Sequence, residues 1–286
     1  MNDGRRWVCL GAAILPESEA VVPVRHRGFL HGETLFETLR AESGRPIWLC
    51  EHLERLESSA RELEFPLPAR PPVEELLVAL LRRNRLRDAR LRLTVTREED
   101  PGWILTADPL ELPVDAAAYR EGVSVTTWSP PWAPWGGSGA VAKSGAWMAP
   151  AAAQRKARAG GDWEAIRLDP QRRVCEGAAS NLFWLRKGTL ETPALSLGIL
   201  AGIIREKVIA LAPALGLQVR ELAEPLVAHL EEADEIVLTN SLWEVLPVVR
   251  WRGRPVGDGR VGPWAPQLRQ ALRTLAGGAL RPGSRP

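Results

Sequence analysis

Two neighbouring stretches, VAKSGAWMAPAAAQRKARAGGDWEAIRLD (residues 141–169) and RRVCEGAASNLFWL (residues 172–185), carry the residues on which our interpretation of this sequence rests. Lys143, in the first stretch, is one of four lysines in a chain that otherwise uses arginine for positive charge. Arginine keeps its proton near neutral pH, whereas a desolvated lysine becomes a free amine that can form a Schiff base with an aldehyde. Lys143 is therefore a candidate for covalent chemistry. The alternative is a solvated lysine at a loop end, since most lysines lie at the surface.

Glu176, in the second stretch, closes a short strand, and a turn of small residues leads from it into an apolar strand. A carboxylate in that position can face a pocket. Next to a pyridine nitrogen it would keep that nitrogen protonated and so maintain the ring as an electron sink. An ordinary turn carboxylate is the alternative that the residues alone leave open.

A third element, GILAGIIRE (residues 198–206), has a glycine before a predicted helix whose first free amides belong to Ile203 and Ile204. Helix N-termini attract phosphate, because unpaired N–H groups and the positive end of the helix dipole meet there. Arg55 and Ser241 could complete such a phosphate site with a charge and a hydroxyl donor. Their alternatives are an exposed helix arginine and a turn serine.

Hydrophobic periodicity predicts an α+β fold. Apolar side chains at helical spacing predict helices at residues 48–63 and 73–86, and alternating runs at residues 91–97 and 103–107 predict antiparallel strands. The rest of the chain is predicted to be rich in strands, at residues 123–128, 165–168, 181–185, 219–222, 236–239 and 245–251, with helices near 203–215 and 226–232.

The prolines that follow the first group of elements indicate a linker between two domains. We expect an N-terminal α+β domain at residues 1–110, a linker at 111–117 and a strand-rich C-terminal domain at 118–286. Residues 130–139 are predicted to form an irregular loop just before Lys143, and the last ten residues are predicted to fray.

Composition excludes several classes of function. With 37 basic and 35 acidic side chains the formal charge is +2, which is too small for nucleic acid to be the expected partner. Cys9, Cys50 and Cys175 lack the spacing of a zinc site or a disulfide framework, so we expect no metal and a reducing, cytoplasmic location. No apolar run approaches the roughly 20 residues of a membrane span, and the N-terminus does not resemble a secretory signal.

The order and spacing of these pieces resemble the class IV, or fold-type IV, pyridoxal-phosphate enzymes. The resemblance covers nearly the whole chain. It runs through RGFLHGETLFETLR (27–40), EHLERLESSARELEFPLP (51–68), the Lys143 segment, DPQRRVCEGAASNLFWLRKG (169–188), TP (192–193), GILAGIIRE (198–206) and ADEIVLTNSLWEVLPVV (233–249). It implies a two-domain α+β fold, with a small N-terminal α/β sandwich and a larger strand-rich C-terminal domain, a pseudo-barrel, that binds the cofactor.

In that family the lysine that matches Lys143 forms the Schiff base with pyridoxal 5'-phosphate and moves protons, and the glutamate that matches Glu176 pairs with the pyridine nitrogen. The phosphate site carries over to Arg55, to the amides of Ile203 and Ile204, and to Ser241. Threonine is common at position 204 in the family, so Ile204 can offer only its N–H. The family also forms dimers, which predicts a homodimer here.

The substrate side is inferred from the same resemblance. Thr38 matches a threonine whose hydroxyl could help to direct a proton. Arg97 matches an arginine that binds a substrate carboxylate, although Glu98 stands where glycine often follows. Arg40 and His31 match residues at the rim of the pocket, each as compatible with a structural role. Asn240 lies in the run TNSLWEVLPV, which looks most like the lyases of the family.

We therefore predict a pyridoxal-phosphate-dependent lyase that releases pyruvate and 4-aminobenzoate from 4-amino-4-deoxychorismate, on the route to folate. Met148 supports this choice, because branched-chain enzymes usually have tyrosine at its position. The alternative within the same fold is a class IV aminotransferase that acts on D-amino acids or branched-chain amino acids. An alternative of another class is a binding or scaffold protein that has lost the chemistry.

Overall fold

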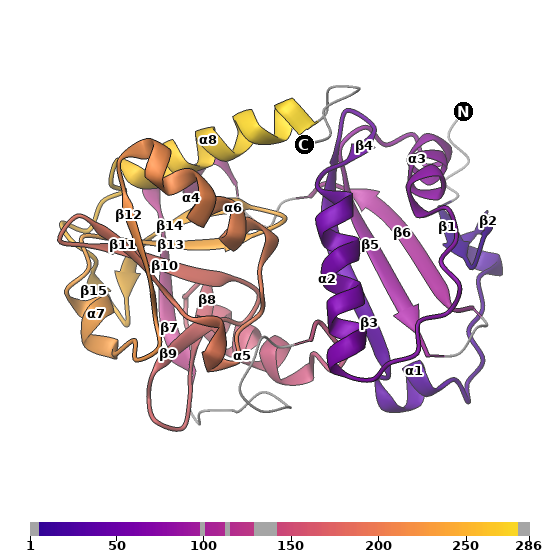
Figure 1. Ribbon diagram of the computed structural model, residues 1–286, viewed down its shortest axis with the longest axis horizontal. Coiled ribbons are helices and arrows are strands. Elements are labelled where there is room, and N and C mark those ends of the chain that lie inside the picture. Colours follow the sequence, from indigo (N-terminus) through magenta and orange to yellow (C-terminus); the bar gives the residue numbers. More distant parts are fainter. Residues whose placement is uncertain (1–5, 98–100, 112–114, 129–141, 280–286) are drawn as a thin grey trace. The chain divides into compact units, whose positions relative to one another are not determined.

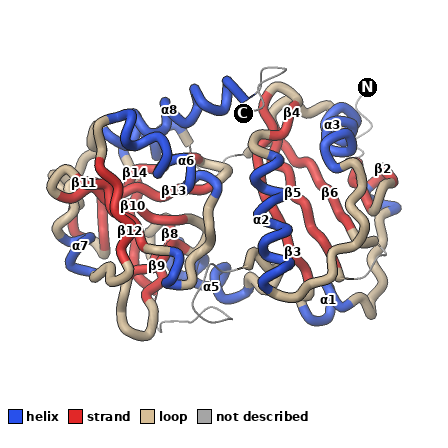
Figure 2. The backbone as a smooth tube through the Cα atoms, in the orientation of Figure 1, coloured by secondary structure: helices blue, strands red, loops and turns tan. Residues whose placement is uncertain are grey.

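The computed structural model describes residues 6–97, 101–111, 115–128 and 142–279. Helices and strands are mixed along this part of the chain, as the sequence predicts, and none of its helices has the length and apolar character that a membrane crossing requires. The chain divides into two compact units, whose helices and strands can be followed in Figures 1 and 2.

Each unit contains separated parts of the chain. The first consists of the described residues up to Glu111, Ala142–Ala146 and the described residues from Ala276 onward. The second consists of residues 115–128 and Trp147–Leu275. The sequence assigns all of residues 118–286 to one domain, so the structure differs in where it places Lys143. The reason is local pairing. Leu35 and Ser144 form an antiparallel β-bridge, which ties the Lys143 segment to a strand of the first unit.

The first unit contains one antiparallel sheet, in which six strands of the described chain lie in the order β2-β1-β6-β5-β3-β4. The strands are β1 (Trp7–Leu10), β2 (Ala13–Pro16), β3 (Thr34–Glu42), β4 (Arg45–Pro46), β5 (Ala89–Thr96) and β6 (Trp103–Pro109). The helices are α1 (Arg27–His31), α2 (Leu49–Glu62) and α3 (Val73–Arg83), with a 3₁₀ turn, η1 (Glu17–Glu19). The predicted helices and the predicted strand pair are confirmed, with ends that shift by a few residues.

The two faces of this sheet differ in character. Leu91 and Leu93 of β5 are fully buried, whereas Arg92 and Thr94 are only partly buried, because successive side chains of a strand point to opposite faces. Helices α2 and α3 cover the apolar face and share its hydrophobic core (Figure 1). We call the opposite face the polar face; it carries Phe36, Thr38, Arg40, Arg92 and Thr94 at alternating positions of β3 and β5.

The second unit is rich in strands, and its described residues form a sheet of nine strands in the order β12-β11-β10-β13-β14-β7-β8-β9, with β15 paired to β14. The strands are β7 (Val123–Trp128), β8 (Glu164–Leu168), β9 (Val174–Gly177), β10 (Asn181–Arg186), β11 (Thr189–Pro193), β12 (Gln218–Leu222), β13 (Glu235–Asn240), β14 (Glu244–Trp251) and β15 (Arg254–Pro255). The helices are α4 (Ala116–Glu121), α5 (Met148–Ala159), α6 (Ile203–Leu211), α7 (Val227–Glu231) and α8 (Trp264–Ala279), with 3₁₀ turns η2 (Leu195–Leu197) and η3 (Ala212–Leu215).

This sheet is curled into a half-barrel. Strand β9 ends the strand order at one side, yet it also contacts β10 and β11 near the other side. A short turn joins β9 to β10, with the Gly177 amide donating to the Ser180 carbonyl at 2.8 Å. The concave packing encloses an apolar core that includes Trp184, Leu246 and Trp251. The predicted strands and the helices near 203–215 and 226–232 are confirmed.

Helix α8 was not predicted from the sequence. Its buried side chains, Ala265, Leu268, Leu272 and Ala276, recur at helical spacing, but two of the four are alanines, which carry a weak hydrophobic signal. The helix extends into the tail that we expected to fray, since residues 277–279 are helical, and the rest of that tail lies outside the described residues. The loop predicted at residues 130–139 also lies outside them.

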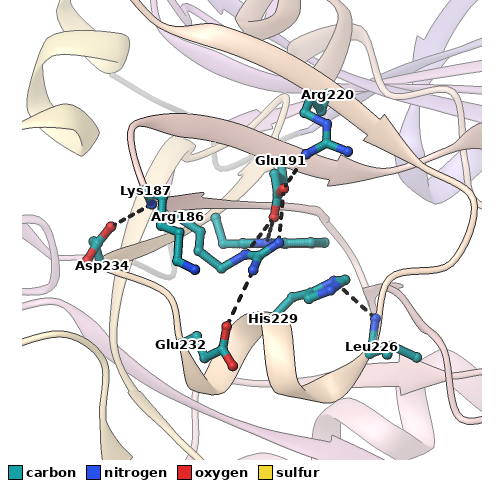
Figure 3. Close-up of polar contacts among 9 residues, drawn as sticks. Arg186, Lys187, Glu191, Arg220, Leu226, His229, Glu232 and Asp234 are labelled. Atoms are coloured by element: carbon teal, nitrogen blue, oxygen red, sulfur yellow. Dashed lines mark hydrogen bonds and ion pairs between the residues drawn. The ribbon is translucent and has the colours of Figure 1, made fainter.

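One buried carboxylate of the second unit is fully compensated by cations and donors. Glu191 of β11 accepts hydrogen bonds from the Trp184 indole at 2.8 Å and from Arg186 Nε at 3.1 Å, and Arg220 lies 3.6 Å away (Figure 3). Burial alone would raise the pKa of the Glu191 carboxyl, but Arg186 and Trp184 lower it below its usual range. This cluster joins β10, β11 and β12, and we assign it to stability.

A second buried carboxylate, Glu164 of β8, has no cation bonded to it among the described residues. Its two oxygens accept from the Ala179 amide and from the Ser180 hydroxyl, both at 2.5 Å, so it holds the turn between β9 and β10. A Cβ at Gly177 would lie 2.7 Å from this carboxyl, which explains the glycine. Burial, assisted by the negative charge of Glu176, raises the pKa of Glu164 to about 7, against the two hydrogen bonds.

We expect Glu164 to make the protein less stable as pH rises. Its folded-state pKa of about 7 exceeds the ordinary 4.5, so the folded protein binds more protons between these values than the unfolded chain does. The free energy of unfolding should therefore fall as pH rises from 4.5 through 7, by up to about 3 kcal/mol at one pKa unit per 1.36 kcal/mol. Urea unfolding of wild type and Glu164→Gln at several pH values measures this difference.

The glutamine of Glu164→Gln keeps an acceptor for Ala179 and a polar partner for Ser180 but does not titrate, so the variant should lose the decline. Glu231→Gln, at an exposed carboxylate of α7, is the matched control. Its free energy of unfolding should fall with rising pH as that of wild type does. Parallel stability curves for wild type and Glu164→Gln across this range would contradict the prediction.

Candidate active site

Lys143 is fixed to the edge of β3 by its own backbone. The Phe36 amide donates to the Lys143 carbonyl at 3.0 Å, and the Lys143 amide donates to Ser59 Oγ at 3.3 Å. Two residues further on, the Gly145 amide donates to the Thr34 carbonyl at 2.7 Å. A Cβ at Gly145 would lie 2.0 Å from Thr34 Oγ1, so only glycine allows this close pairing.

This pairing places the side chain of Lys143 on the polar face. Residues opposite each other in an antiparallel pair share a face, and Lys143 lies opposite Phe36. Accordingly, Lys143 Nζ lies 4.6 Å from the centre of the Phe36 ring. The guanidinium carbon of Arg92 lies 4.0 Å from the same centre. An amine and a guanidinium therefore flank one aromatic ring.

The predicted substrate residues divide into two groups. Thr38 follows Phe36 on the polar face and is the cross-strand partner of Arg92, so the structure brings it near Lys143. Arg40 lies further along that face and pairs with Glu42 at 2.6 Å. Arg97 lies beyond the end of β5, 53% exposed and 3.8 Å from Glu33, and His31 is exposed at the end of α1, so neither is brought to the polar face.

Arg55 lies on α2, against the apolar face of the same sheet, where a buried carboxylate holds it. Glu37 accepts from Arg55 Nε at 2.8 Å and from its terminal nitrogen at 2.5 Å, and the ring of His52 contacts Glu37 at 2.7 Å. Burial would raise the pKa of Glu37, but Arg55 and His52 lower it to about 2. The sequence analysis did not identify Glu37 and His52; a glutamate inside the apolar run TLFETLR was the available signal.

In the second unit, Glu176 is held between a strand and a loop. Its Oε2 accepts from the Leu200 amide at 2.9 Å and from Asn181 Nδ2 at 3.3 Å, and its Oε1 lies 3.5 Å from the buried guanidinium of Arg167. Arg167 also donates to the Gly198 carbonyl at 2.7 Å. Asn181 and Arg167 were missed by the sequence analysis, although an arginine within a fully buried strand is a recognisable signal.

The N-terminus of α6 comes next in the chain after the loop that holds Glu176. Gly202 is its N-cap residue and supplies no side chain, and a Cβ there would lie 1.9 Å from Asn181 Oδ1. The first helical residues, Ile203 and Ile204, have buried side chains, so their contribution to an anion site is their N–H groups. The expectation that Ile204 offers only its amide agrees with this burial.

The third loop of the site is the turn after β13, which is joined to the turn that follows Glu176. The side-chain oxygen of Asn240, at the end of β13, accepts from the Leu242 and Trp243 amides at 2.9 and 3.0 Å, and its Nδ2 donates to the Ala179 carbonyl at 3.0 Å. The turn that contains Ser241 is thereby tied to the turn that follows Glu176. The predicted residues Glu176, Ile203, Ile204, Asn240 and Ser241 therefore lie in one cluster of loops within the second unit.

The chemistry of these groups fits pyridoxal 5'-phosphate. An amine on a fixed backbone suits the aldehyde, and an ionisable carboxylate suits the protonated ring nitrogen. A helix N-terminus capped by glycine suits the phosphate, because its amides and dipole favour an anion and no side chain blocks the approach. The described residues thus include a group of each kind that the cofactor requires.

Comparison with known proteins agrees with the assignment of these groups to pyridoxal 5'-phosphate. The model of the amino-transferase class IV family matches residues 34–251. The branched-chain-amino-acid aminotransferase of Salmonella typhimurium is 31% identical over 274 residues, covering 89% of this chain and 87% of that protein. The D-alanine aminotransferase of Listeria monocytogenes is 29% identical over 271 residues, covering 90% and 91%.

Solved structures give the same answer. The T.th. branched-chain amino acid aminotransferase, with pyridoxamine 5'-phosphate, superposes with a TM-score of 0.85 at 30% identity, covering 97% of this chain and 96% of that one. The Escherichia coli branched-chain enzyme gives a TM-score of 0.84 at 29% identity, covering 98% and 97%. The chain therefore belongs to the class IV aminotransferase family of pyridoxal-phosphate-dependent enzymes, with the fold-type IV architecture.

Proposed function

We propose that this enzyme is an aminotransferase that transfers the amino group of a branched-chain or D-amino acid to a 2-oxo acid. The observation that carries the proposal is Lys143, whose backbone is fixed to β3 and whose amine lies on the polar face, in a chain whose named relatives are aminotransferases of these two kinds.

The expectation of a lyase loses its main support. It rested on the run around Asn240, on the run CEGAASNLFW and on Met148, and the amide of Asn240 is engaged with the backbone of its own turn and with Ala179. The role of Asn240 is thus explained by turn geometry without a substrate. The relatives reported above are branched-chain and D-alanine aminotransferases, and none of them is a lyase.

Each predicted cofactor residue has a role in this proposal. When bound, pyridoxal phosphate supplies a conjugated ring that takes up the electrons released as the substrate Cα–H bond breaks. Lys143 would hold the cofactor covalently, and its amine, once displaced by the substrate amine, would take the proton from the substrate Cα and deliver it to the cofactor carbon that carried the aldehyde. Glu176 accepts a hydrogen bond from the ring nitrogen. The hydroxyl of Thr38 directs the proton on the polar face.

The phosphate is proposed to lie at the N-terminus of α6, where the amides of Ile203 and Ile204 donate to it. Ser241 adds a hydroxyl and Arg55 a positive charge. Glu37 acts on the phosphate indirectly, because it fixes the direction of the Arg55 guanidinium, and His52 in turn contacts Glu37.

We propose a homodimer, supported by an exposed apolar segment of the first unit. Val21, Val24, Phe29 and Leu30 are 76%, 77%, 73% and 53% exposed, which is unusual for four large apolar residues so close in sequence. A cytoplasmic location is proposed from the three cysteines, which are free.

The reaction is tested with the purified enzyme loaded with pyridoxal phosphate. L-leucine or D-alanine with 2-oxoglutarate should give glutamate, whereas aminodeoxychorismate should give no 4-aminobenzoate. Lys143→Ala should abolish the visible absorption of the bound cofactor and slow transamination by about 10³-fold, in the range of general acid–base catalysis. Lys156→Ala, at an exposed lysine of α5, is the control. Release of 4-aminobenzoate from aminodeoxychorismate in the absence of an oxo acid would contradict the proposal.

Glu37→Gln should weaken both stability and phosphate binding. Removing one member of a buried ion pair leaves Arg55 uncompensated and costs about 3 kcal/mol. The pKa of about 2 lies below the ordinary 4.5, so the stabilisation by Glu37 is present above 4.5 and is lost as pH falls toward 2. Urea unfolding and titration with pyridoxal phosphate measure the two effects.

Glu57→Gln is the matched control, because Glu57 lies on the same helix and pairs with Arg70 at the surface, with side chains 43% and 54% exposed. It should change stability by less than about 1 kcal/mol. Equal effects of the two substitutions would show that the buried pair has no special role.

Phe29→Asp combined with Val24→Asp should shift the sedimentation coefficient from that of a dimer to that of a monomer, because the charges would be buried at an apolar interface. Arg25→Ala, at an exposed residue of the same segment, should leave the dimer intact. A wild-type enzyme that sediments as a monomer at micromolar concentration contradicts the homodimer.

A further inference from the structure

Glu244, at the start of β14, has a backbone conformation that few side chains adopt. Its φ is +66°, in the left-handed region that favours glycine. Other non-glycine residues of the described chain share this region, but Glu244 alone among them is buried. A buried glutamate at a position where glycine would be free of strain indicates that the carboxylate itself is needed there.

Helix α8 holds this carboxylate. Arg269 and Arg273 donate from Nε to Glu244 Oε2 at 3.2 and 2.9 Å. The two arginines are four residues apart, so they lie on one face of the helix. The helix is also fixed to the sheet at its first residue, because the Trp264 amide donates to the carboxylate of Glu235, at the start of β13, at 3.2 Å. Two cations on a fixed helix therefore meet one buried carboxylate.

Glu244 closes the turn that carries Ser241. Asn240 and Glu244 are cross-strand partners at the ends of β13 and β14, so only residues 241–243 lie in the turn between them. The side-chain oxygen of Asn240 accepts from the amides of Leu242 and Trp243. The turn is thus fixed by Asn240 at one end and by Glu244 at the other.

Arg269 also reaches the turn by a second route. Its guanidinium carbon lies 3.5 Å from the centre of the Tyr119 ring, and the Tyr119 hydroxyl donates to the Trp243 carbonyl at 2.9 Å. Ser241 itself is partly exposed, so its hydroxyl lies where a ligand can reach it. The contacts of α8 therefore hold the backbone on one side of Ser241 and leave the residue accessible.

We propose that Glu244 is a positioning residue for the phosphate of the cofactor: α8 holds its carboxylate, and its backbone fixes the direction of Ser241. This inference rests on the proposed placement of the phosphate at Ser241 and at the N-terminus of α6. Without the two ion pairs, the strain of the left-handed backbone at Glu244 would have no opposing interaction. The turn would then relax, and Ser241 would lose its direction.

The test compares pyridoxal phosphate with pyridoxal, which has the same aldehyde and ring but no phosphate. Each is titrated into the full chain freed of cofactor, and its absorption is followed. In Glu244→Gln the dissociation constant of pyridoxal phosphate should rise by about 10-fold, as expected for loss of charged hydrogen bonds, while that of pyridoxal should stay within about twofold. A general role in folding would weaken both alike.

Glu244→Gly separates the backbone from the side chain. Glycine relieves the strain at this φ but removes the carboxylate, so pyridoxal phosphate should bind at least as weakly as in Glu244→Gln. Arg252→Gly is the matched control, because Arg252 is exposed and also has a positive φ, of 50°. It should bind pyridoxal phosphate as wild type does.

A double variant tests the route through Ser241. Ser241→Ala should weaken the binding of pyridoxal phosphate. Because Glu244 is proposed to act through Ser241, Ser241→Ala combined with Glu244→Gln should bind no more weakly than the weaker of the two single variants. Full addition of the two effects would show that Glu244 acts elsewhere.

Three further outcomes overturn the inference: unchanged binding of pyridoxal phosphate in Glu244→Gln, an equal loss of pyridoxal phosphate and pyridoxal, or binding like that of wild type in Glu244→Gly. Where these variants fail to fold, Arg273→Gln replaces them, since Arg273 is 49% exposed and Arg269 remains. It should show a smaller loss confined to pyridoxal phosphate, and an equal loss of both probes would contradict the inference. Absence of transamination by wild type would instead refute the proposed reaction, and the titration would still report on Glu244.

Discussion

The pairing of residues 142–146 with β3 is the constraint on which the rest of the site depends. It fixes Lys143 through its backbone carbonyl and sets the side chain opposite Phe36, while Ser59 of α2 accepts from the Lys143 amide. The neighbouring residue on the strand, Glu37, points to the other face and holds Arg55. The adjacent residues Phe36 and Glu37 therefore point to opposite faces of the sheet. A shift of the strand register by one residue would exchange the faces to which they point.

Buried carboxylates organise both units, and their surroundings determine their behaviour. Glu37 is compensated by Arg55 and His52, which hold its pKa at about 2 despite complete burial. Glu164 receives only an amide and a hydroxyl, and its pKa rises to about 7. The first arrangement fixes a charge in place. The second leaves a carboxyl that titrates near neutral pH, under the turn that follows Glu176.

In the second unit, two asparagines do most of the positioning. Asn181 joins Glu176 to the loop before α6, and Asn240 joins the turn of Ser241 to the turn at Ala179. Neither needs to touch a ligand to matter, because each sets the direction of backbone amides. This explains why the run around Asn240 suggested a substrate role that its hydrogen bonds do not require.

The sequence by itself determined the elements with a strong period, such as α2, α3 and β7, the family resemblance, and the candidacy of Lys143 and Glu176, because these depend on local pattern and on the order of motifs. Helix α8 was not predicted from the sequence, because alanine side chains are only a weak signal of a buried helix face. Only the tertiary structure decided that Arg92 and Lys143 pack against the same ring, that of Phe36, whereas Arg97 does not, and that Arg55 and His52 both pair with Glu37. These facts depend on which strands pair and in what register, and the residues concerned lie far apart in the chain.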